Sequence, residues 1–307
     1  MERDLQNILC GGVAGCASRT AVAPLERLKI LFQVQDIMRK GTTAAASAPK
    51  YSGVWQSLRR IGAEEGVRGY FRGNGANCAR VFPYIAIQFA AFERMKPLLL
   101  SDGATALTPL QKLAGGAVAG AVSVVFTYPL DFVRARLTVQ GGLATAQYRG
   151  IWDALQGTYR ADRLAGMYRG VSPTLLGVAP YVGLNFMVFE TLRGAVPRDA
   201  DGNPDMLAVL GCGALAGACG QTAAYPMDLL RRRLQVSSLS GSQGGAASTS
   251  TVGALRVIVQ QEGVRGLYKG LWPNFIKVVP SIAIMFTTNE LLQRQYARSQ
   301  ALWRVAV

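Results

Sequence analysis

Three short segments of the chain combine a proline, an acid and a base at one fixed spacing. In each segment an acidic residue stands two positions after the proline, and a basic residue stands three positions further on. A proline near the end of a helix kinks it and can turn the following charges toward a common axis. There the charges can form ion pairs that are made and broken reversibly, so we expect a gate. The charged residues are Glu26, Lys29, Asp131, Arg134, Asp228 and Arg231.

A second set of equivalent positions differs among the segments. Three residues before a later proline the chain has Arg80, Gly177 and Lys277. Burying a cation in a membrane costs roughly 2.5–3.5 kcal/mol, so two lipid-facing cations would be hard to explain. In a water-filled cavity they would attract phosphates, the arginine bidentately. Gly177 with Val178 leaves room for a flat group, and Tyr181, one turn further on, offers an aromatic face.

Each of these interpretations has a plainer alternative. The gate charges could be solvated helix ends, because exposed ion pairs contribute little to stability, but their threefold recurrence favours a gate. Arg80 and Lys277 could be held in internal ion pairs. Gly177 could be a helix-packing glycine, and Tyr181 an aromatic that packs between helices.

The charged segments belong to three copies of one longer unit. Each copy contains the proline segment, then an acidic element that ends in a base and a glycine, then a Glu near the end of a second apolar stretch. These nine matches in register indicate an internal repeat. The first prolines are 105 (129 − 24) and 97 (226 − 129) residues apart. We therefore divide the chain into repeats at 1–100, 101–197 and 198–307.

Each repeat is predicted to contain two membrane spans joined by a polar segment with a short amphipathic helix. The segments 40–50 and 238–251, rich in Ala, Ser, Thr and Gly, are expected to be loops. The predicted fold is an all-α membrane protein, with six transmembrane helices in three pseudo-threefold repeats. The spans are expected at 6–34, 74–98, 109–139, 171–194, 205–236 and 271–295.

Composition agrees with a membrane protein that moves a solute. Half of the 307 residues are hydrophobic and 17% are charged. The formal net charge is +15, but the basic residues form no recognisable recognition element, so we expect no nucleic-acid partner. The chain has no histidine, no metal-ligand cluster and no paired nucleophile and base. We therefore expect neither enzyme activity nor a metal or cofactor. The five cysteines are interpreted as packing thiols.

Charge also predicts the orientation of the chain in the membrane. The segment 29–72 has eight basic residues and three acidic ones, whereas the short connection 97–109 has Asp102 and no base. By the positive-inside tendency, the long loops face one compartment and both termini face the other.

The triple Pro-x-acid-x-x-base signature resembles that of the mitochondrial carrier family over nearly the whole chain. The segments 18–29, 73–80, 177–186 and 277–284 look like those of plant-type mitochondrial adenine nucleotide transporters, and coenzyme A and ATP-Mg/phosphate carriers are similar. This resemblance implies exchange of ATP, ADP and AMP across the mitochondrial inner membrane. A carrier of coenzyme A or adenosine 3′,5′-diphosphate, or an ATP-Mg/phosphate carrier, is the alternative. A non-transporting receptor on the same fold is a further one.

The resemblance also implies a monomer whose long loops and short amphipathic helices face the matrix and whose termini face the intermembrane space. Gln33 and Gln235 resemble braces on the gate ring, while the second repeat has Thr138 at that position. A second ring at the cytoplasmic face would exchange with the first, giving alternating access. In that ring Gln293 replaces the sixth, basic member. The ring is expected to contain Glu93, Lys96, Glu190, Arg193, Glu290 and Gln293.

Two further sets of site residues follow from the resemblance. Arg19 matches a cationic substrate residue of adenine nucleotide carriers, and the pair Gly177 and Val178 goes with adenine-containing substrates. The glycines that end the acidic elements are implied to bind cardiolipin. They are Gly73, Gly170 and Gly270.

Overall fold

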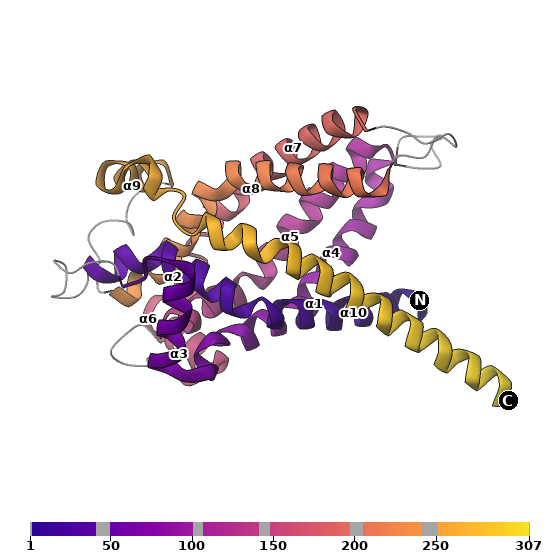
Figure 1. Ribbon diagram of the computed structural model, residues 1–307, viewed down its shortest axis with the longest axis horizontal. Coiled ribbons are helices and arrows are strands. Elements are labelled where there is room, and N and C mark those ends of the chain that lie inside the picture. Colours follow the sequence, from indigo (N-terminus) through magenta and orange to yellow (C-terminus); the bar gives the residue numbers. More distant parts are fainter. Residues whose placement is uncertain are drawn as a thin grey trace. The chain divides into compact units, whose positions relative to one another are not determined.

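The structure is a computed structural model, which describes residues 2–40, 50–100, 107–140, 148–196, 205–240 and 251–306. Helices occupy almost all of these residues and no strand occurs among them, so the all-α prediction is confirmed. Six long helical segments lie where the spans were expected (Figure 1). They are α1 (Glu2–Ala21) followed by α2 (Ala23–Lys40), α4 (Asn74–Leu99), α5 (Pro109–Val139), α7 (Val171–Gly194), α8 (Met206–Val236) and α10 (Leu271–Ala306).

Most residues of the two expected loops, 41–49 and 241–250, lie outside the described part of the chain. The residues at 238–240 belong to a short 3-10 helix, η2 (Ser237–Ser240). By length and composition alone, Leu110–Val139, Val171–Gly194 and Leu271–Tyr296 are apolar enough to cross a membrane. The other long segments are more polar, which suits helices that turn charged side chains toward a polar interior.

A shorter helix follows the first long segment of each repeat. Each is kinked where the backbone has a positive φ: 68° at Gly66, 58° at Arg163 and 69° at Gly263. The threefold repetition predicted from the sequence is therefore present in the backbone. The short helices are α3 (Val54–Tyr70), α6 (Ile151–Met167) and α9 (Thr251–Gly266).

The chain forms two compact units, and the first contains α1 to α6 and α10. Within this unit, α4 packs against both α1 and α5, and α6 packs against α5. Leu28 and Leu31 of α2 form a hydrophobic core with Ile61 of α3. Val133 of α5 and Ala154 of α6 belong to a second core. The unit consists of residues Met1–Asp36, Ala46–Tyr168 and Trp272–Val307.

The second unit contains α7, α8, η2 and α9. Its largest interface lies between α7 and α8, which run side by side (Figure 1). Leu229 and Leu230 of α8 pack against Ala254 and Ile258 of α9. Each short helix is thus held to the long helix that precedes it by a small apolar core. This unit consists of residues Ile37–Ala45 and Arg169–Leu271.

The first long segment differs from its two equivalents at the proline. It is interrupted at Val22, between α1 and α2, whereas α5 and α8 continue through their prolines. In α5 and α8 the residue before the proline is a buried tyrosine that stacks on a second tyrosine. Tyr128 lies 5.8 Å from Tyr168 and Tyr225 lies 6.2 Å from Tyr268, measured between ring centres. The first segment has Ala23 there, so it lacks this aromatic support.

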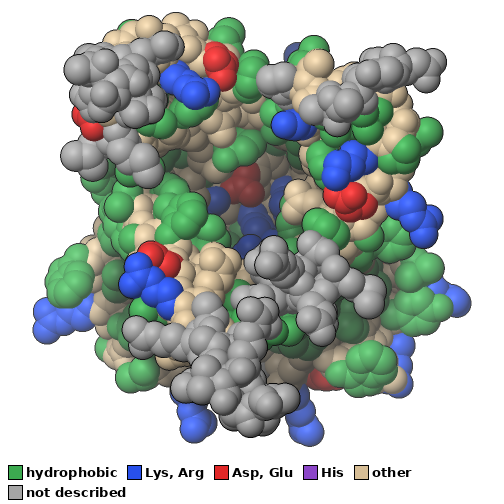
Figure 2. All heavy atoms as spheres, turned by 90° about the vertical axis from the view of Figure 1, so that its right-hand side faces the viewer, with side chains coloured by type: hydrophobic (Ala, Val, Ile, Leu, Met, Phe, Trp, Pro, Cys, Tyr) green, Lys and Arg blue, Asp and Glu red, His purple; other side chains and the backbone are tan. Residues whose placement is uncertain are grey.

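Large hydrophobic side chains are exposed along the long helices, among them Phe126 in α5, Met187 in α7 and Phe286 in α10. Figure 2 shows hydrophobic side chains spread over the face that it draws, with charged side chains scattered between them. Large exposed apolar side chains of this kind are expected of helices that contact lipid.

Candidate functional site

Glu26, in the first turn of α2, contacts two cations from other helices. Its Oε2 lies 3.0 Å from Nη2 of Arg134 in α5, and its Oε1 lies 2.6 Å from Nζ of Lys277 in α10. All three side chains are at least four-fifths buried. The contact with Arg134 joins an expected gate acid of the first repeat to an expected gate base of the second. The contact with Lys277 joins the same acid to an expected substrate residue.

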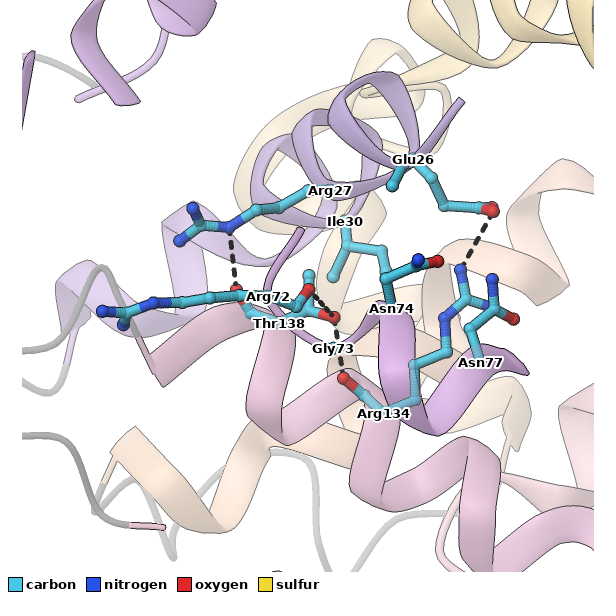
Figure 3. A pocket seen from close by; sticks show the side chains of 10 residues that line it. Glu26, Arg27, Ile30, Arg72, Gly73, Asn74, Asn77, Arg134 and Thr138 are labelled. Atoms are coloured by element: carbon cyan, nitrogen blue, oxygen red, sulfur yellow. Dashed lines mark hydrogen bonds and ion pairs between the residues drawn. The ribbon is translucent and has the colours of Figure 1, made fainter. Parts of the chain in front are cut away.

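The structure is closely packed beside this ion pair (Figure 3). The space between α2, α4 and α5 has a volume of about 10 Å³, roughly what a single water molecule needs. Nε of Arg27 donates a hydrogen bond to the Thr138 carbonyl oxygen at 3.2 Å. The Thr138 hydroxyl donates to the Arg134 carbonyl oxygen at 2.7 Å. No solute of nucleotide size fits between these three helices.

A larger cavity of about 300 Å³ lies against the other face of Glu26, lined by α1, α4 and α10. Arg19 and Lys277 supply its cations. Nη1 of Arg19 is positioned by a 3.0 Å hydrogen bond to Oδ1 of Asn77. The Ser18 hydroxyl donates to the Ser281 carbonyl oxygen at 2.6 Å and ties α1 to α10. The volume is at the lower end of the range for small-molecule sites, roughly 300–1,000 Å³.

Arg80 lies beside this cavity and is held from two sides. Its Nη1 is 3.7 Å from Oδ1 of Asp131, so it makes an internal ion pair with an expected gate acid. Its guanidinium lies 5.6 Å from the ring centre of Tyr84, which lines the cavity. Sequence reasoning missed Tyr84. The available signal was that Tyr84 and Tyr181 both directly follow the proline of an even-numbered span.

The expected adenine-contacting residues lie on α7, in the second unit. A Cβ atom added at Gly177 would lie 3.1 Å from Cβ of Met227 in α8. The missing side chain therefore lets α7 approach α8 closely, which is the packing role left open by the sequence. Val178 is partly buried, and Tyr181 is exposed enough to contact a solute.

The remaining gate residues lie on the helices where they were expected. Oε1 of Gln235 accepts a 2.9 Å hydrogen bond from Nη1 of Arg232 in the same helix. The ion pairs that would complete the ring around the third repeat stay a prediction. The residues concerned are Lys29 and Gln33 in α2, and Asp228 and Arg231 in α8.

The residues of the expected second gate are exposed near the other ends of their helices. Nζ of Lys96 lies 3.2 Å from Oε1 of Glu93 in the same helix. Glu290 pairs with Arg294, four residues further along α10. Arg294 directly follows Gln293, the neutral residue at the expected sixth position of the ring. In the first unit, therefore, charges are joined between repeats at the Glu26 end and within single helices at the Glu93 end. Glu190 and Arg193 lie near the C-terminal end of α7.

The three expected lipid-binding glycines all have positive φ values: 80° at Gly73 and 87° at both Gly170 and Gly270. Beside Gly73 lies an open cavity of about 390 Å³ to which Arg72 and Arg149 contribute. A basic cavity next to the N-terminus of α4 suits an anionic head group.

Sequence reasoning also missed an ion pair that ties the short helix of each repeat to the preceding long helix. The acid is always the one that opens the acidic element. The arginine comes three residues after the proline in the first repeat and seven after it in the others, which hides the equivalence. The pairs are Arg27–Glu65 at 2.7 Å, Arg136–Asp162 at 3.9 Å and Arg233–Glu262 at 2.6 Å.

The third of these pairs shifts the titration of its acid. Burial alone raises the pKa of Glu262, because it penalises the charged form. Hydrogen bonds and attraction from Arg233 and Lys269 outweigh burial and hold the pKa of Glu262 below its ordinary value.

The chain matches the family described as mitochondrial carrier protein over residues 3–103, 105–199 and 202–300. It is 44% identical over 311 residues to the mitochondrial adenine nucleotide transporter of Arabidopsis thaliana, covering 94% of this chain and 86% of that protein. It is 39% identical over 301 residues to a mitochondrial carrier protein of Zea mays, covering 94% and 86%. It is 35% identical over 299 residues to the mitochondrial adenyl nucleotide antiporter of Homo sapiens, covering 96% of this chain and 59% of that protein. The chain therefore belongs to the mitochondrial carrier family, whose members are transporters.

Proposed function

We propose that the protein exchanges ATP, ADP and AMP across the mitochondrial inner membrane by alternating access. The observation that carries this proposal is the cavity of about 300 Å³ to which Arg19 and Lys277 contribute cations, with Arg80 beside it. Several cations grouped in this way suit a polyphosphate, which can accept several charge-assisted hydrogen bonds. Relatives named as an adenine nucleotide transporter and an adenyl nucleotide antiporter support the same substrate class.

The ion pairs suggest how a bound nucleotide opens the gate. Lys277 contacts Glu26 and Arg80 contacts Asp131, so each of these cations is held by an expected gate carboxylate. Phosphate oxygens that take over Lys277 and Arg80 leave both carboxylates with fewer partners. The energy of substrate binding then offsets part of the cost of breaking the gate. Gly177, Val178 and Tyr181 of α7 are proposed to contact the adenine ring.

The decisive experiment is uptake of labelled ATP into liposomes that contain the purified protein. We expect uptake when the vesicles are preloaded with ATP, ADP or AMP, and none when they are empty. A competition panel of unlabelled ATP, ADP, AMP, coenzyme A, adenosine 3′,5′-diphosphate and phosphate then ranks the solutes. Stronger competition by coenzyme A or adenosine 3′,5′-diphosphate than by ATP, ADP or AMP would indicate that those compounds are the substrates. Absence of exchange with every solute would leave a receptor rather than a carrier.

Two neutral substitutions test the site itself. Arg80→Gln and Lys277→Gln should each lower kcat/KM for ATP about 10- to 100-fold, since a hydrogen bond to a charged group contributes about 1.5–3 kcal/mol. Arg94→Gln in α4 and Lys112→Gln in α5 are matched controls, because each removes one exposed cation near the end of a long helix. Normal exchange by both site variants would contradict the proposed site.

The membrane setting is part of the proposal. We place the long loops and short helices in the matrix and both termini toward the intermembrane space, with a monomer as the working unit. Cardiolipin is proposed to bind at Gly73, Gly170 and Gly270, and the basic cavity beside Gly73 supports the first of these sites. Protease digestion of intact and of opened mitochondrial inner-membrane vesicles measures which side the long loops face.

A further inference from the structure

Two of the five cysteines face each other between α1 and α4 of the first unit. Sγ of Cys16 lies 3.8 Å from the carbonyl oxygen of Cys78, and Sγ of Cys78 lies 3.9 Å from the carbonyl oxygen of Cys16. The two thiols also interact with one another. Each sulfur thus reaches the main chain of the opposite cysteine, although the two residues are 62 positions apart in the sequence.

The way in which α1 and α4 pack explains why these thiols meet. On one side of them, Nδ2 of Asn74 donates a 2.9 Å hydrogen bond to the Thr20 hydroxyl. On the other side, a Cβ atom added at Gly12 would overlap the ring of Phe82. Each step is four residues along either helix, about one turn, so the contacts lie on one face of each helix. The successive pairs are Gly12 with Phe82, Cys16 with Cys78, and Thr20 with Asn74.

Small residues hold the two helices close together at this level. A Cβ atom added at Gly15, next to Cys16, would lie 3.2 Å from Cγ1 of Val81. Close approach matters because a disulfide requires Cα atoms about 4.4–6.8 Å apart, whereas helix axes usually lie about 8–10 Å apart. Rotation about the two Cα–Cβ bonds can then turn the sulfurs toward each other. Both cysteines are partly exposed, so a small oxidant can reach them.

We infer that Cys16 and Cys78 are a redox-sensitive pair, whose oxidation forms a disulfide that fastens α1 to α4 and slows transport. The oxidant is a peroxide, with hydrogen peroxide as the simplest case. A thiol that has lost its proton attacks one peroxide oxygen, the O–O bond breaks, and the departing hydroxide takes up the proton as water. The attacking sulfur becomes a sulfenic acid.

The second thiol completes the disulfide. Its sulfur attacks the sulfur of the sulfenic acid, the S–O bond breaks, and the hydroxyl leaves with the second thiol proton as water. In total the two thiols lose two hydrogens and two electrons are transferred to the peroxide, which becomes two water molecules. A dithiol reductant reverses the change by thiol–disulfide exchange.

The disulfide would lie in a wall of the cavity that contains Arg19 and Lys277, because α1 and α4 both line that cavity. Arg19 follows Cys16 by three residues, and its side chain is held by Asn77, the residue directly before Cys78. A covalent bond at this place prevents α1 and α4 from moving past one another. Changes of access that need such movement are therefore slowed. This consequence rests on the proposed function, whereas formation of the disulfide does not.

Peptide mapping detects the disulfide without changing either thiol. In a Cys10→Ser protein, the tryptic peptides 4–19 and 73–80 contain Cys16 and Cys78, respectively, and no other cysteine. The protein in liposomes is treated with hydrogen peroxide, blocked with N-ethylmaleimide and digested without reductant. We expect the two peptides to be joined, lighter by two hydrogens than their sum, and to separate in dithiothreitol. A further Cys219→Ser change, at an exposed position of α8, is the control and should leave the joined peptides in place.

Two mapping results would overturn the inference. The first is that both thiols stay open to N-ethylmaleimide, or are oxidised singly to sulfinic acid, which would leave them as the packing thiols expected from the sequence. The second is that the joined peptides come only from a dimer on a non-reducing gel, which would place the disulfide between copies of the chain.

ATP exchange by the same vesicles tests the effect on transport. Peroxide should slow exchange at least about fivefold, the lower end of typical coupling between sites, and dithiothreitol should restore it. Exchange by Cys16→Ser or Cys78→Ser should be insensitive to the same treatment. Joined peptides with unchanged exchange would contradict the restraint on transport. Absence of exchange in the reduced protein as well would count against the proposed function, because the mapping detects the disulfide without transport.

Discussion

Glu26 holds two cations at once, Arg134 of the expected gate and Lys277 of the expected substrate site. The sequence pattern could predict the first contact, because it repeats in every proline segment. It could not predict the second, because Lys277 belongs to a position that differs among the repeats and lies 251 residues away. Likewise, the sequence shows Tyr84 directly after a proline, as it does Tyr181, but only the structure shows its ring beside Arg80. Periodic features of the site were thus predictable, whereas contacts between unlike positions were not.

Substituting Glu26→Gln should destabilise the protein by about 3–5 kcal/mol, because it leaves two largely buried cations without their shared carboxylate. Thermal unfolding in detergent measures the loss. Glu93→Gln is the matched control: it removes an exposed pair within one helix, which should change stability by less than about 1 kcal/mol. Equal unfolding temperatures for the two variants would show that Glu26 is not held as described.

Arg163 has φ 58° and ψ −161°, a backbone conformation that is strained for any residue with a Cβ. The first and third repeats have Gly66 and Gly263 at this kink. Arg163→Gly should therefore raise the stability of the protein by about 1 kcal/mol. Arg160→Gly, in the preceding regular turn of α6, should lower it by about 1 kcal/mol. The unfolding temperatures of both variants test this opposition in sign, and a loss of stability in Arg163→Gly would contradict the strain.

At the scale of helices, the sequence located the six long segments to within a few residues at most boundaries. Apolar stretches bounded by charged motifs were sufficient for this, and the threefold repeat supplied each boundary three times. The interruption at Val22 was not predictable, since all three segments contain the proline. It occurs in the one segment that has Ala23 where α5 and α8 have a stacked tyrosine.

Gly73→Ala should weaken the start of α4. The glycine has φ 80°, and an added Cβ would overlap the Thr138 hydroxyl and lie 3.0 Å from the Arg134 carbonyl oxygen. We expect a loss of roughly 1–3 kcal/mol in thermal unfolding. Gly75→Ala is the control: nothing lies near the added Cβ and the position is helical, so this change should be neutral or stabilising. Similar behaviour of the two variants would argue against the tight contact at Gly73.

The tie between α8 and α9 should depend on pH. The pKa of Glu262 is lowered in the folded state. The ionised carboxylate therefore stabilises the folded state fully above the unfolded pKa of about 4.3. This stabilisation is lost as the pH falls through the lower pKa of the folded state. At pH 7, α9 should therefore be less stable in Glu262→Gln than in the parent protein. The difference should shrink between about pH 5 and pH 3. Hydrogen exchange in α9 provides the measurement, and a difference that is constant with pH would contradict the ion pair.

At the scale of the whole molecule, the two ends of the helices in the first unit differ. Charges near Glu26 join different repeats, whereas those near Glu93 pair within single helices. We expect the 300 Å³ cavity to be reached from the Glu93 end, the side of the short connections. In a protein whose five cysteines are replaced by serine, Ser281→Cys should react with a membrane-impermeant maleimide added on that side.

Bound ATP should slow this labelling of Ser281→Cys, since the residue lines the proposed site. Ser57→Cys, at a buried position of α3, is the control and should stay unlabelled from either side. Labelling of Ser281→Cys only from the side of the long loops would reverse the assigned access.

The hydrogen bond between Ser18 and Ser281 spans 263 residues of chain, nearly its whole length. A contact of that separation cannot form until the third repeat has been synthesised and inserted. Until then Glu26 lacks Lys277, one of its two cation partners. The cavity that contains Arg19 and Lys277 is accordingly completed last, and a chain that stops after two repeats lacks the wall that α10 contributes to it.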